Sequence, residues 1–276
     1  MRNIIIASIL MFITFCSCQK INGNGEIVTE TINISEKFQE VVNDTKFDVE
    51  VFFTNENKIV ITGESNIIDR LTVKVKNGKL YIKKERNKYK LRNSEPLTIV
   101  VYMQRKDYMY FTNSGSGNMI VNSPVAKKVL IENNGSGDIV AYDLDSEVAE
   151  IKNSGSGNAF AYSPISNEMR IYGSGSGNIH VEDTENEAVE VKNTGSGNIF
   201  ASGVAGDVKI ISSSSGKVDC YHLLAQYVEV HSSGSGMVEA YATDEGDVWV
   251  SGSGEVYVYG TERVRFHYTD DPYIDA

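Results

Sequence analysis

Cysteine and proline are scarce in this chain of 276 residues, and each scarcity limits the structures that the chain can form. Two of the three cysteines, Cys16 and Cys18, follow an apolar N-terminal segment. The third, Cys220, then has no partner for an intramolecular disulfide, so packing must stabilise the fold. Only 4 prolines accompany 24 glycines and 15 tyrosines, and no long stretch shows helical periodicity. This mixture suits many strands joined by tight glycine turns.

Positive charge is also in short supply, with 26 Lys and Arg against 37 Asp and Glu and a formal net charge of −11. Such a chain repels phosphates, so we expect no nucleic acid partner. The one basic run covers residues 83–92. It is either a solvated loop between strands or a contact for anionic lipid headgroups or acidic glycans.

The N-terminus has the pattern of a secretory leader. Arg2 precedes an apolar run over residues 4–15 that is too short to span a bilayer as a mature helix. The following residues, Ser17 and Cys18, resemble the lipobox of bacterial lipoproteins. By that resemblance residues 1–17 are a signal peptide, Cys18 carries the lipid, and residues 18–22 form a short tether. The alternative is an ordinary secretory signal with cleavage nearby.

A Gly-Ser-Gly repeat dominates the rest of the chain. Its steps are close to 20 residues, the length of one solenoid turn. The corner glycines are Gly115, Gly117, Gly135, Gly137, Gly155, Gly157, Gly175, Gly177, Gly195, Gly197, Gly216, Gly234, Gly236, Gly252 and Gly254. The repeat predicts an all-β, single-chain parallel β-solenoid, right-handed and β-helix-like, with rungs of about 20 residues.

Residues on both sides of each corner alternate with the period of a strand that has one buried face. After each closing glycine, small or aliphatic residues occupy offsets two and four, and Cys220 lies in that inward column. We therefore expect Cys220 to be a core residue. Glycine suits the corners for two reasons: it reaches positive φ cheaply, and stacked corners leave no room for an inner side chain. The corner serines can hydrogen-bond along the stack.

The mature domain, residues 23–276, divides into three parts. Residues 23–111 lack the glycine corner but keep strand signals, including the hairpin pair Asn77-Gly78. We expect them to be irregular N-terminal rungs that cap the first open edge. Residues 112–260 carry the regular repeats, and residues 261–276 are expected to cap the other end.

The chain resembles the putative auto-transporter adhesin, head GIN domain family of Gram-negative lipoproteins. The resemblance rests on the lipobox at Cys18, the strand pair over residues 47–62, the Asn77-Gly78-Lys79-Leu80 turn, and the corners at Gly177 and Gly197. It covers most of the mature chain and implies an all-β solenoid with a suggested adhesive role. It supplies no catalytic motif.

The outward positions of the first strand in each rung should be solvated, yet apolar residues dominate them, which indicates that something covers this face. The cover is the chain itself, a subunit or protein interface, or a glycan that stacks on tyrosines beside acids. The candidate ligand or partner residues are Phe160, Phe200, Tyr142, Tyr162, Tyr221, Tyr241, Tyr257, Tyr259, Asp219 and Glu239.

Asp219 and Glu239 lie on adjacent rungs, about 4.8 Å apart by strand spacing. Paired carboxylates near that separation can cleave glycosides, so a polysaccharide-processing β-helix enzyme is the alternative function. The four histidines show no metal-ligand spacing, and only Asp138 fits a calcium-binding corner. We therefore expect neither a metal nor a cofactor.

These observations favour a protein without catalytic activity. We expect an outer-membrane lipoprotein that faces the periplasm or the cell surface and serves as a binding or scaffolding protein of the adhesin type. The expected partners are the membrane through the N-terminal lipid, a glycan or protein ligand, and a second copy of the chain in a homo-oligomer.

Overall fold

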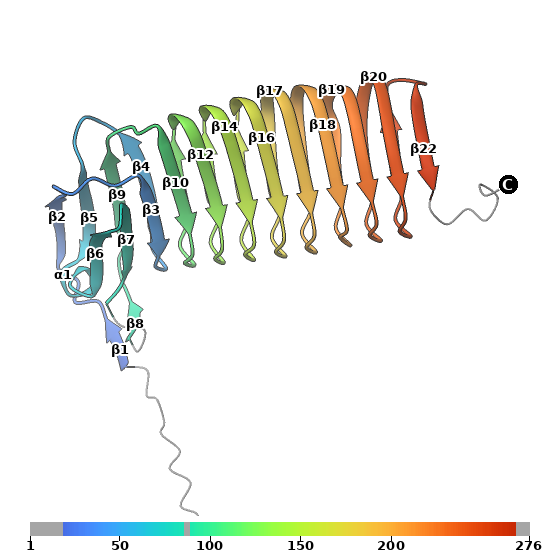
Figure 1. Cartoon of the computed structure of the whole chain (residues 1–276). Helices are drawn as coiled ribbons and strands as arrows, with labels where there is room; N and C mark the ends of the chain where they lie inside the picture. The colour runs from blue at the N-terminus through green and yellow to red at the C-terminus, as the bar shows by residue number, and fades with distance from the viewer. Residues whose placement is uncertain (1–18, 86–88, 269–276) are drawn as a thin grey trace, which may run out of the picture.

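The computed structural model describes residues 19–85 and 89–268 and shows a parallel β-solenoid of about eight turns (Figure 1). In the first regular turns, a short strand follows the glycine corner and a longer strand follows a second corner. The short and long strands are β11 (Met119–Asn122) and β12 (Val125–Asn133), β13 (Ile139–Tyr142) and β14 (Asp145–Asn153), and β15 (Ala159–Tyr162) and β16 (Ile165–Gly173). The predicted fold class is confirmed.

Further along the chain, the short and long pieces merge into continuous strands. These are β17 (Ile179–Asn193), β18 (Ile199–Ser212), β19 (Val218–Ser232) and β20 (Val238–Val250), followed by a last turn of β21 (Val256–Tyr259) and β22 (Val264–Tyr268). Register partners lie one repeat apart, as in Ile139 with Ala159 and Ile131 with Ile151. The inward columns are buried, and Cys220 is 1% exposed among them. Burial raises the pKa of its thiol to about 12, as expected for a core cysteine.

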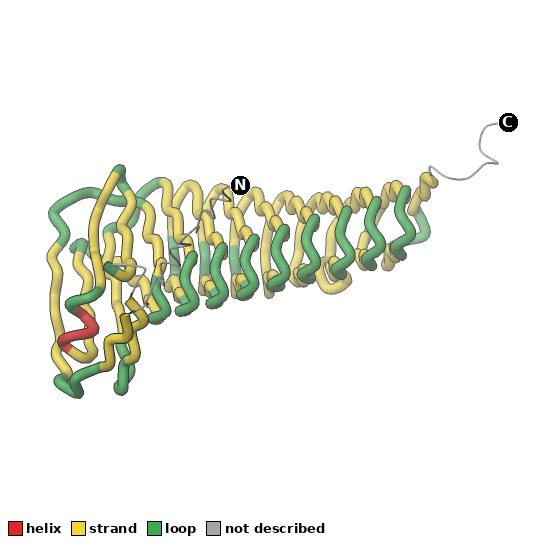
Figure 2. The backbone as a smooth tube through the Cα atoms, turned by 90° about the horizontal axis from the view of Figure 1, so that it is seen from below, coloured by secondary structure: helices red, strands yellow, loops and turns green. Residues whose placement is uncertain are grey.

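The glycine corners form a single row along the solenoid (Figure 2). A Cβ at Gly157 would collide with the carbonyl oxygen of Gly137, and a Cβ at Gly155 would collide with that of Gly135. The predicted lack of space is therefore confirmed. The prediction that these corners need positive φ is wrong. Among the described residues, the glycines with positive φ are Gly25, Gly78, Gly203 and Gly260, and no corner glycine is one of them.

Asparagines hold several of the glycine corners from inside and from outside. On the inside, buried Asn153 donates from Nδ2 to the carbonyl oxygens of Gly157 (2.8 Å) and Asn178 (3.0 Å). On the outside, the Oδ1 of Asn158 accepts a hydrogen bond from the backbone N–H of Asn178 on the next rung (2.9 Å). These bonds satisfy backbone groups that the sharp turn takes out of the strand ladder.

The second corner of each rung uses a different device. Ser123, Asp143, Ser163 and Asp183 have φ between 48° and 55°, the left-handed region. On the next rung Gly203, the register partner of Thr184, has φ 129°. Short polar side chains tolerate this conformation better than most residues. The residues with a left-handed backbone conformation therefore lie at the corner opposite the glycine corner of each rung.

The N-terminal head, residues 27–111, closes the first end of the solenoid. Its parallel strands continue the stack and are β3 (Glu40–Asp44), β4 (Asp48–Phe53), β7 (Lys79–Lys84), β9 (Thr98–Met103) and β10 (Tyr108–Asn113). Its antiparallel strands are β2 (Ile27–Asn33) and β5 (Lys58–Glu64), with β6 (Leu71–Lys76) on β7, and a single helical turn, α1 (Ser65–Ile68), follows β5. Asn77 and Gly78 both have positive φ, as the hairpin signal requires.

Part of the basic run forms a strand, which corrects the expectation of a solvated loop. Strand β8 (Tyr89–Arg92) pairs in parallel with β1 (Gln19–Asn22). This two-stranded arm extends beyond the row of glycine corners (Figure 1).

No helix among the described residues is long and apolar enough to cross a membrane. Residues 1–18, with the leader and Cys18, lie outside the described residues.

The last turn ends in β22, whose one pairing partner within residues 19–85 and 89–268 is β20. Phe266 is aligned with the fully buried Val248 but is itself 41% exposed. Of the expected C-terminal cap over residues 261–276, residues 264–268 form this final strand, and residues 269–276 lie outside the described part. The cap therefore stays a prediction.

Candidate ligand-binding face

The outward face of the first strands is open. Tyr142, Tyr221 and Tyr259 are 41%, 39% and 38% exposed, and Tyr257 is 43% exposed. The strands that carry these residues pair only with the neighbouring rungs, and no other described element pairs with them. The described part of the chain therefore does not supply the internal cover that was one explanation of the apolar face.

One half of this face is an aromatic ladder. The ring of His180 stacks between those of Phe160 and Phe200, with ring centroids 5.1 and 4.7 Å apart. Tyr142 and Tyr162 stack beside them at 5.3 Å. The spacing between rungs therefore matches the spacing between stacked rings. Burial lowers the pKa of His180, which favours the neutral imidazole within the stack.

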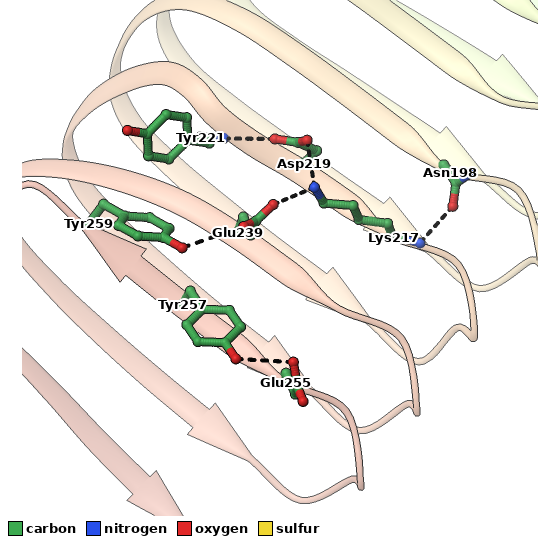
Figure 3. A network of polar contacts seen from close by, with 8 residues as sticks. All are labelled: Asn198, Lys217, Asp219, Tyr221, Glu239, Glu255, Tyr257 and Tyr259. Carbon is green, nitrogen blue, oxygen red and sulfur yellow. Dashed lines mark hydrogen bonds and ion pairs between the residues drawn. The ribbon is translucent and has the colours of Figure 1, made fainter.

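The other half is a cluster of acids and tyrosines, which we call the acid–tyrosine cluster: Lys217, Asp219, Tyr221, Glu239 and Tyr259 (Figure 3). Asp219 and Glu239 are register partners on adjacent rungs. The Nζ of Lys217 bridges them, 2.8 Å from Asp219 Oδ2 and in contact with the carboxylate of Glu239. These two hydrogen bonds raise the pKa of Lys217.

Tyrosine rings surround this bridge. The rings of Tyr221 and Tyr259 meet edge to face with centroids 4.9 Å apart, and the hydroxyl of Tyr259 donates to Glu239 Oε1 (3.4 Å). A hollow of about 240 Å³ lies among Asp219, Tyr221, His222, Glu239 and Tyr259. Burial and the negative charge of Glu239 raise the pKa of Tyr259, so its hydroxyl keeps its proton.

The chemistry of the cluster suits binding better than catalysis. In a retaining glycosidase, one carboxyl group must carry a proton while the other attacks the sugar. Asp219 and Glu239 instead bind the same ammonium group, which occupies the space between them. Among the described residues, no three His, Cys, Asp or Glu side chains gather as metal ligands.

The predicted candidates fall into two groups instead of one continuous stripe. Tyr142, Tyr162, Phe160 and Phe200 belong to the aromatic ladder, whereas Tyr221, Tyr241, Tyr257 and Tyr259 gather around Asp219 and Glu239. Glu182 and Ser202 interrupt the tyrosine column between them. Lys217 was not among the candidates. The sequence feature that could have identified Lys217 is its i, i+2 spacing to Asp219, because this spacing places both side chains on the same side of a strand.

A second hollow was also absent from the predicted candidates. A groove of about 1280 Å³ runs along the glycine corners, and its wall at the head includes Lys46, Tyr89 and Lys90. Its floor consists of exposed corner residues: Ser114, Ser116, Asn134, Ser136, Ser154, Ser156, Ser174, Ser176, Thr194, Ser196, Ser213 and Ser215. Within the described residues, only Ser154 and Thr194 of these hydroxyls bond along the stack, so the expected serine ladder is largely absent.

The regular glycine corners define the class of the protein, a repetitive parallel β-solenoid. Within that class, the chain belongs to the family described as "Putative auto-transporter adhesin, head GIN domain", which matches residues 37–163 and 163–261. The resemblance seen in the sequence is thereby confirmed. Membership of an adhesin-like family indicates a cell-surface or envelope protein. No curated protein matches the chain.

Several solved bacterial structures share the fold. A putative adhesin from Parabacteroides distasonis is 19% identical with a TM-score of 0.65, covering 91% of this chain and 96% of the other. A putative adhesin from Parabacteroides merdae is 18% identical with a TM-score of 0.59, covering 91% and 95%. A putative lipid binding protein from Parabacteroides distasonis is 20% identical with a TM-score of 0.52, covering 90% and 100%. At these identities the likeness concerns the fold alone.

Proposed function

We propose that this protein is a lipid-anchored envelope adhesin that binds glycans at the acid–tyrosine cluster and has no catalytic activity. The observation that carries the proposal is the open hollow in which Tyr221 and Tyr259 stand beside two carboxylates held by Lys217. The lipid is proposed at Cys18, with the solenoid held at the outer membrane as a rigid support.

The cluster has both elements that sugar recognition needs. An exposed tyrosine ring offers an apolar face and a polar hydroxyl, so it can contact both the apolar and the polar parts of a ligand. Carboxylates accept hydrogen bonds from sugar hydroxyls, and charge-assisted bonds of this kind are the stronger ones. Because Lys217 and the rung register fix Asp219 and Glu239 before binding, these side chains lose little conformational entropy when the complex forms.

The polysaccharide-processing alternative receives no support from this geometry, because the bridged carboxylates leave no acid and nucleophile pair in the cluster. A protein interface remains the competing use of the same face. It would be favoured by the apolar ladder of Phe160, His180 and Phe200 more than by the charged cluster.

The test is a glycan array with the mature chain, residues 18–276, beside the double variant Tyr221→Ala/Tyr259→Ala. We expect the mature chain to bind one class of glycan and the double variant to lose at least about tenfold in affinity, since each stacking ring contributes on the order of 1 kcal/mol. The matched control is Tyr142→Ala, which removes an equally exposed tyrosine from the other half of the face. Equal binding by all three proteins, or binding by none, would contradict the proposal.

A further inference from the structure

The arm formed by β1 and β8 has two unlike faces. Ile21 and Leu91 are register partners; Ile21 packs against the hydrophobic core, and Leu91 is 6% exposed. Successive residues of a strand point to opposite sides. The partners Lys20 and Lys90, and Arg92 beyond them, therefore lie together on the opposite, exposed side of the arm.

This exposed face brings positive charges together. Lys20 and Lys90 are direct neighbours across the two strands, and like charges in such positions are destabilising. Within the described residues, Lys20, Lys90 and Arg92 form no ion pair. Several basic side chains elsewhere on the molecule do pair with acids, as Lys209 does with Glu229 and Arg265 does with Asp247. The arm thus holds like charges side by side, and no acidic side chain among the described residues pairs with them.

The position of the arm identifies a partner for these charges. Strand β1 begins at Gln19, one residue after the proposed lipid attachment at Cys18, so the basic face starts where the chain would leave the membrane. The arm also extends beyond the row of glycine corners, away from most of the acidic solenoid (Figure 1). At physiological salt, charges more than about 8 Å away are largely screened. The local positive charge therefore decides what the arm attracts, although the whole chain carries −11.

We infer that Lys20, Lys90 and Arg92 form a docking surface for the anionic headgroups of a phospholipid bilayer. This inference rests on the proposed lipid anchor, to which it adds the second attachment that a lipidated protein uses to fix its position. Since the arm and the corner row lie on the same side of the solenoid, docking turns the serine-lined groove toward the membrane (Figure 1). The solenoid is then held with a defined orientation instead of swinging on its tether.

The test is flotation of the non-acylated mature chain, residues 18–276, with phosphatidylcholine vesicles that contain or lack about 30% phosphatidylglycerol. This chain contains the whole arm and the whole solenoid, residues 19–268. We expect binding to the anionic vesicles alone, with a partition coefficient that falls as the salt concentration rises. In the triple variant Lys20→Gln/Lys90→Gln/Arg92→Gln, we expect the partition coefficient to fall on the order of a hundredfold, at roughly fivefold for each basic residue.

Two matched variants make the result specific. Lys37→Gln/Lys192→Gln/Arg263→Gln removes three exposed basic residues elsewhere and should change the partition coefficient by less than about twofold. Lys20→Arg/Lys90→Arg/Arg92→Lys keeps the charge of the arm and should bind as the parent does. Equal loss in both neutralised variants, or equal binding to vesicles without phosphatidylglycerol, would overturn the inference.

The anchor itself is tested separately by incorporation of labelled palmitate into the full chain and its Cys18→Ala variant. If the chain is acylated but the vesicles show no dependence on the arm, the docking surface is wrong and the anchor stands. If acylation is absent while the arm binds anionic vesicles, the anchor is wrong and the basic surface stands.

Discussion

The head and the repeat body stack strands by different means. In the body, each parallel strand lies on the equivalent strand of the neighbouring rung, and glycines recur at the corners, several of them with an asparagine beside them. In the head, antiparallel strands β2, β5 and β6 are added to the parallel strands that continue the stack. A repeated corner can continue a stack indefinitely, whereas closing one requires strands that run the other way and offer a different edge.

A buried carboxylate takes the place of the repeated corner in the head. Glu64 is fully buried and accepts hydrogen bonds from the backbone N–H groups of Gly25 (2.8 Å) and Ser94 (2.7 Å). Gly23 lies against the same carboxylate, where any side chain would collide with it. One carboxylate at the end of β5 therefore holds the two segments that follow the strands of the arm. In the body, uncharged amides hold the backbone of the corners.

The largest expected effect is at a body corner. Gly157→Ala places a methyl group against the carbonyl oxygen of Gly137, and because both are backbone in a stacked array, the neighbour cannot move aside. We expect a loss of about 1–3 kcal/mol in the free energy of unfolding. Gly246→Ala is the matched control, because its nearest atoms lie 3.5 Å away and its φ is not positive. Thermal unfolding of the two variants should differ clearly, and equal midpoints would refute the steric explanation of the corners.

The head should be the region sensitive to acid. Burial alone would raise the pKa of Glu64, but hydrogen bonds from the backbone of Ser94 and Gly25 outweigh it and hold this pKa below its ordinary 4.5. A lowered carboxyl pKa gives stability that is complete above 4.5 and is lost as the pH falls through the folded value.

Hydrogen exchange can measure this loss by region. We expect the protection factors of β2 and β5, corrected for the intrinsic pH dependence of exchange, to fall on acidification before those of β14 or β16. In Glu64→Gln, we expect the protection factors of the head to be low already at neutral pH. Glu30→Gln, a change at an exposed position on β2, should leave hydrogen exchange in the head unchanged. Uniform acid sensitivity across head and body would show that Glu64 has no special role.

The smallest expected effect concerns the body and His180. Because burial lowers the pKa of this histidine from 6.5, the unfolded chain takes up the proton more readily than the folded chain does. The contribution of His180 is therefore present above pH 6.5 and lost as the pH falls toward the folded value. His180→Phe should reduce the dependence of the melting midpoint on pH in this window, whereas the exposed His222→Phe should not. An unchanged pH dependence in His180→Phe would contradict the stacked, neutral imidazole.

Local repetition made the body predictable from the sequence. The period near 20 and the alternation around each corner correctly placed the buried columns, including Cys220. The same alternation put Tyr221 and Tyr259 on the outward side of the strands, but it did not show that this face is open. The backbone angles were not predictable in this way. Glycine at a corner indicates either positive φ or lack of space, and only the neighbouring rung decides between them, as the contact of Gly157 with Gly137 shows.

The unpredicted features depend on contacts between distant segments. The pairing of β1 with β8 joins two strands of four residues each, separated by most of the head, and neither has enough alternation to indicate a partner. The groove beside the corners depends on where that arm lies, so the serines alone could not reveal it. Lys217 lies outside the aromatic columns, and its role depends on contacts with two successive rungs.

The most direct test of the central proposal is to locate the bound ligand on the molecule. Hydrogen exchange of the mature chain, with and without a glycan captured on the array, distinguishes the acid–tyrosine cluster from the groove. We predict protection of residues 218–222, 238–242 and 256–259, with the corners over residues 134–156 and 174–196 unchanged. Protection of the corners, with no change around Tyr221 and Tyr259, would contradict the proposed site and move ligand binding to the serine-lined groove.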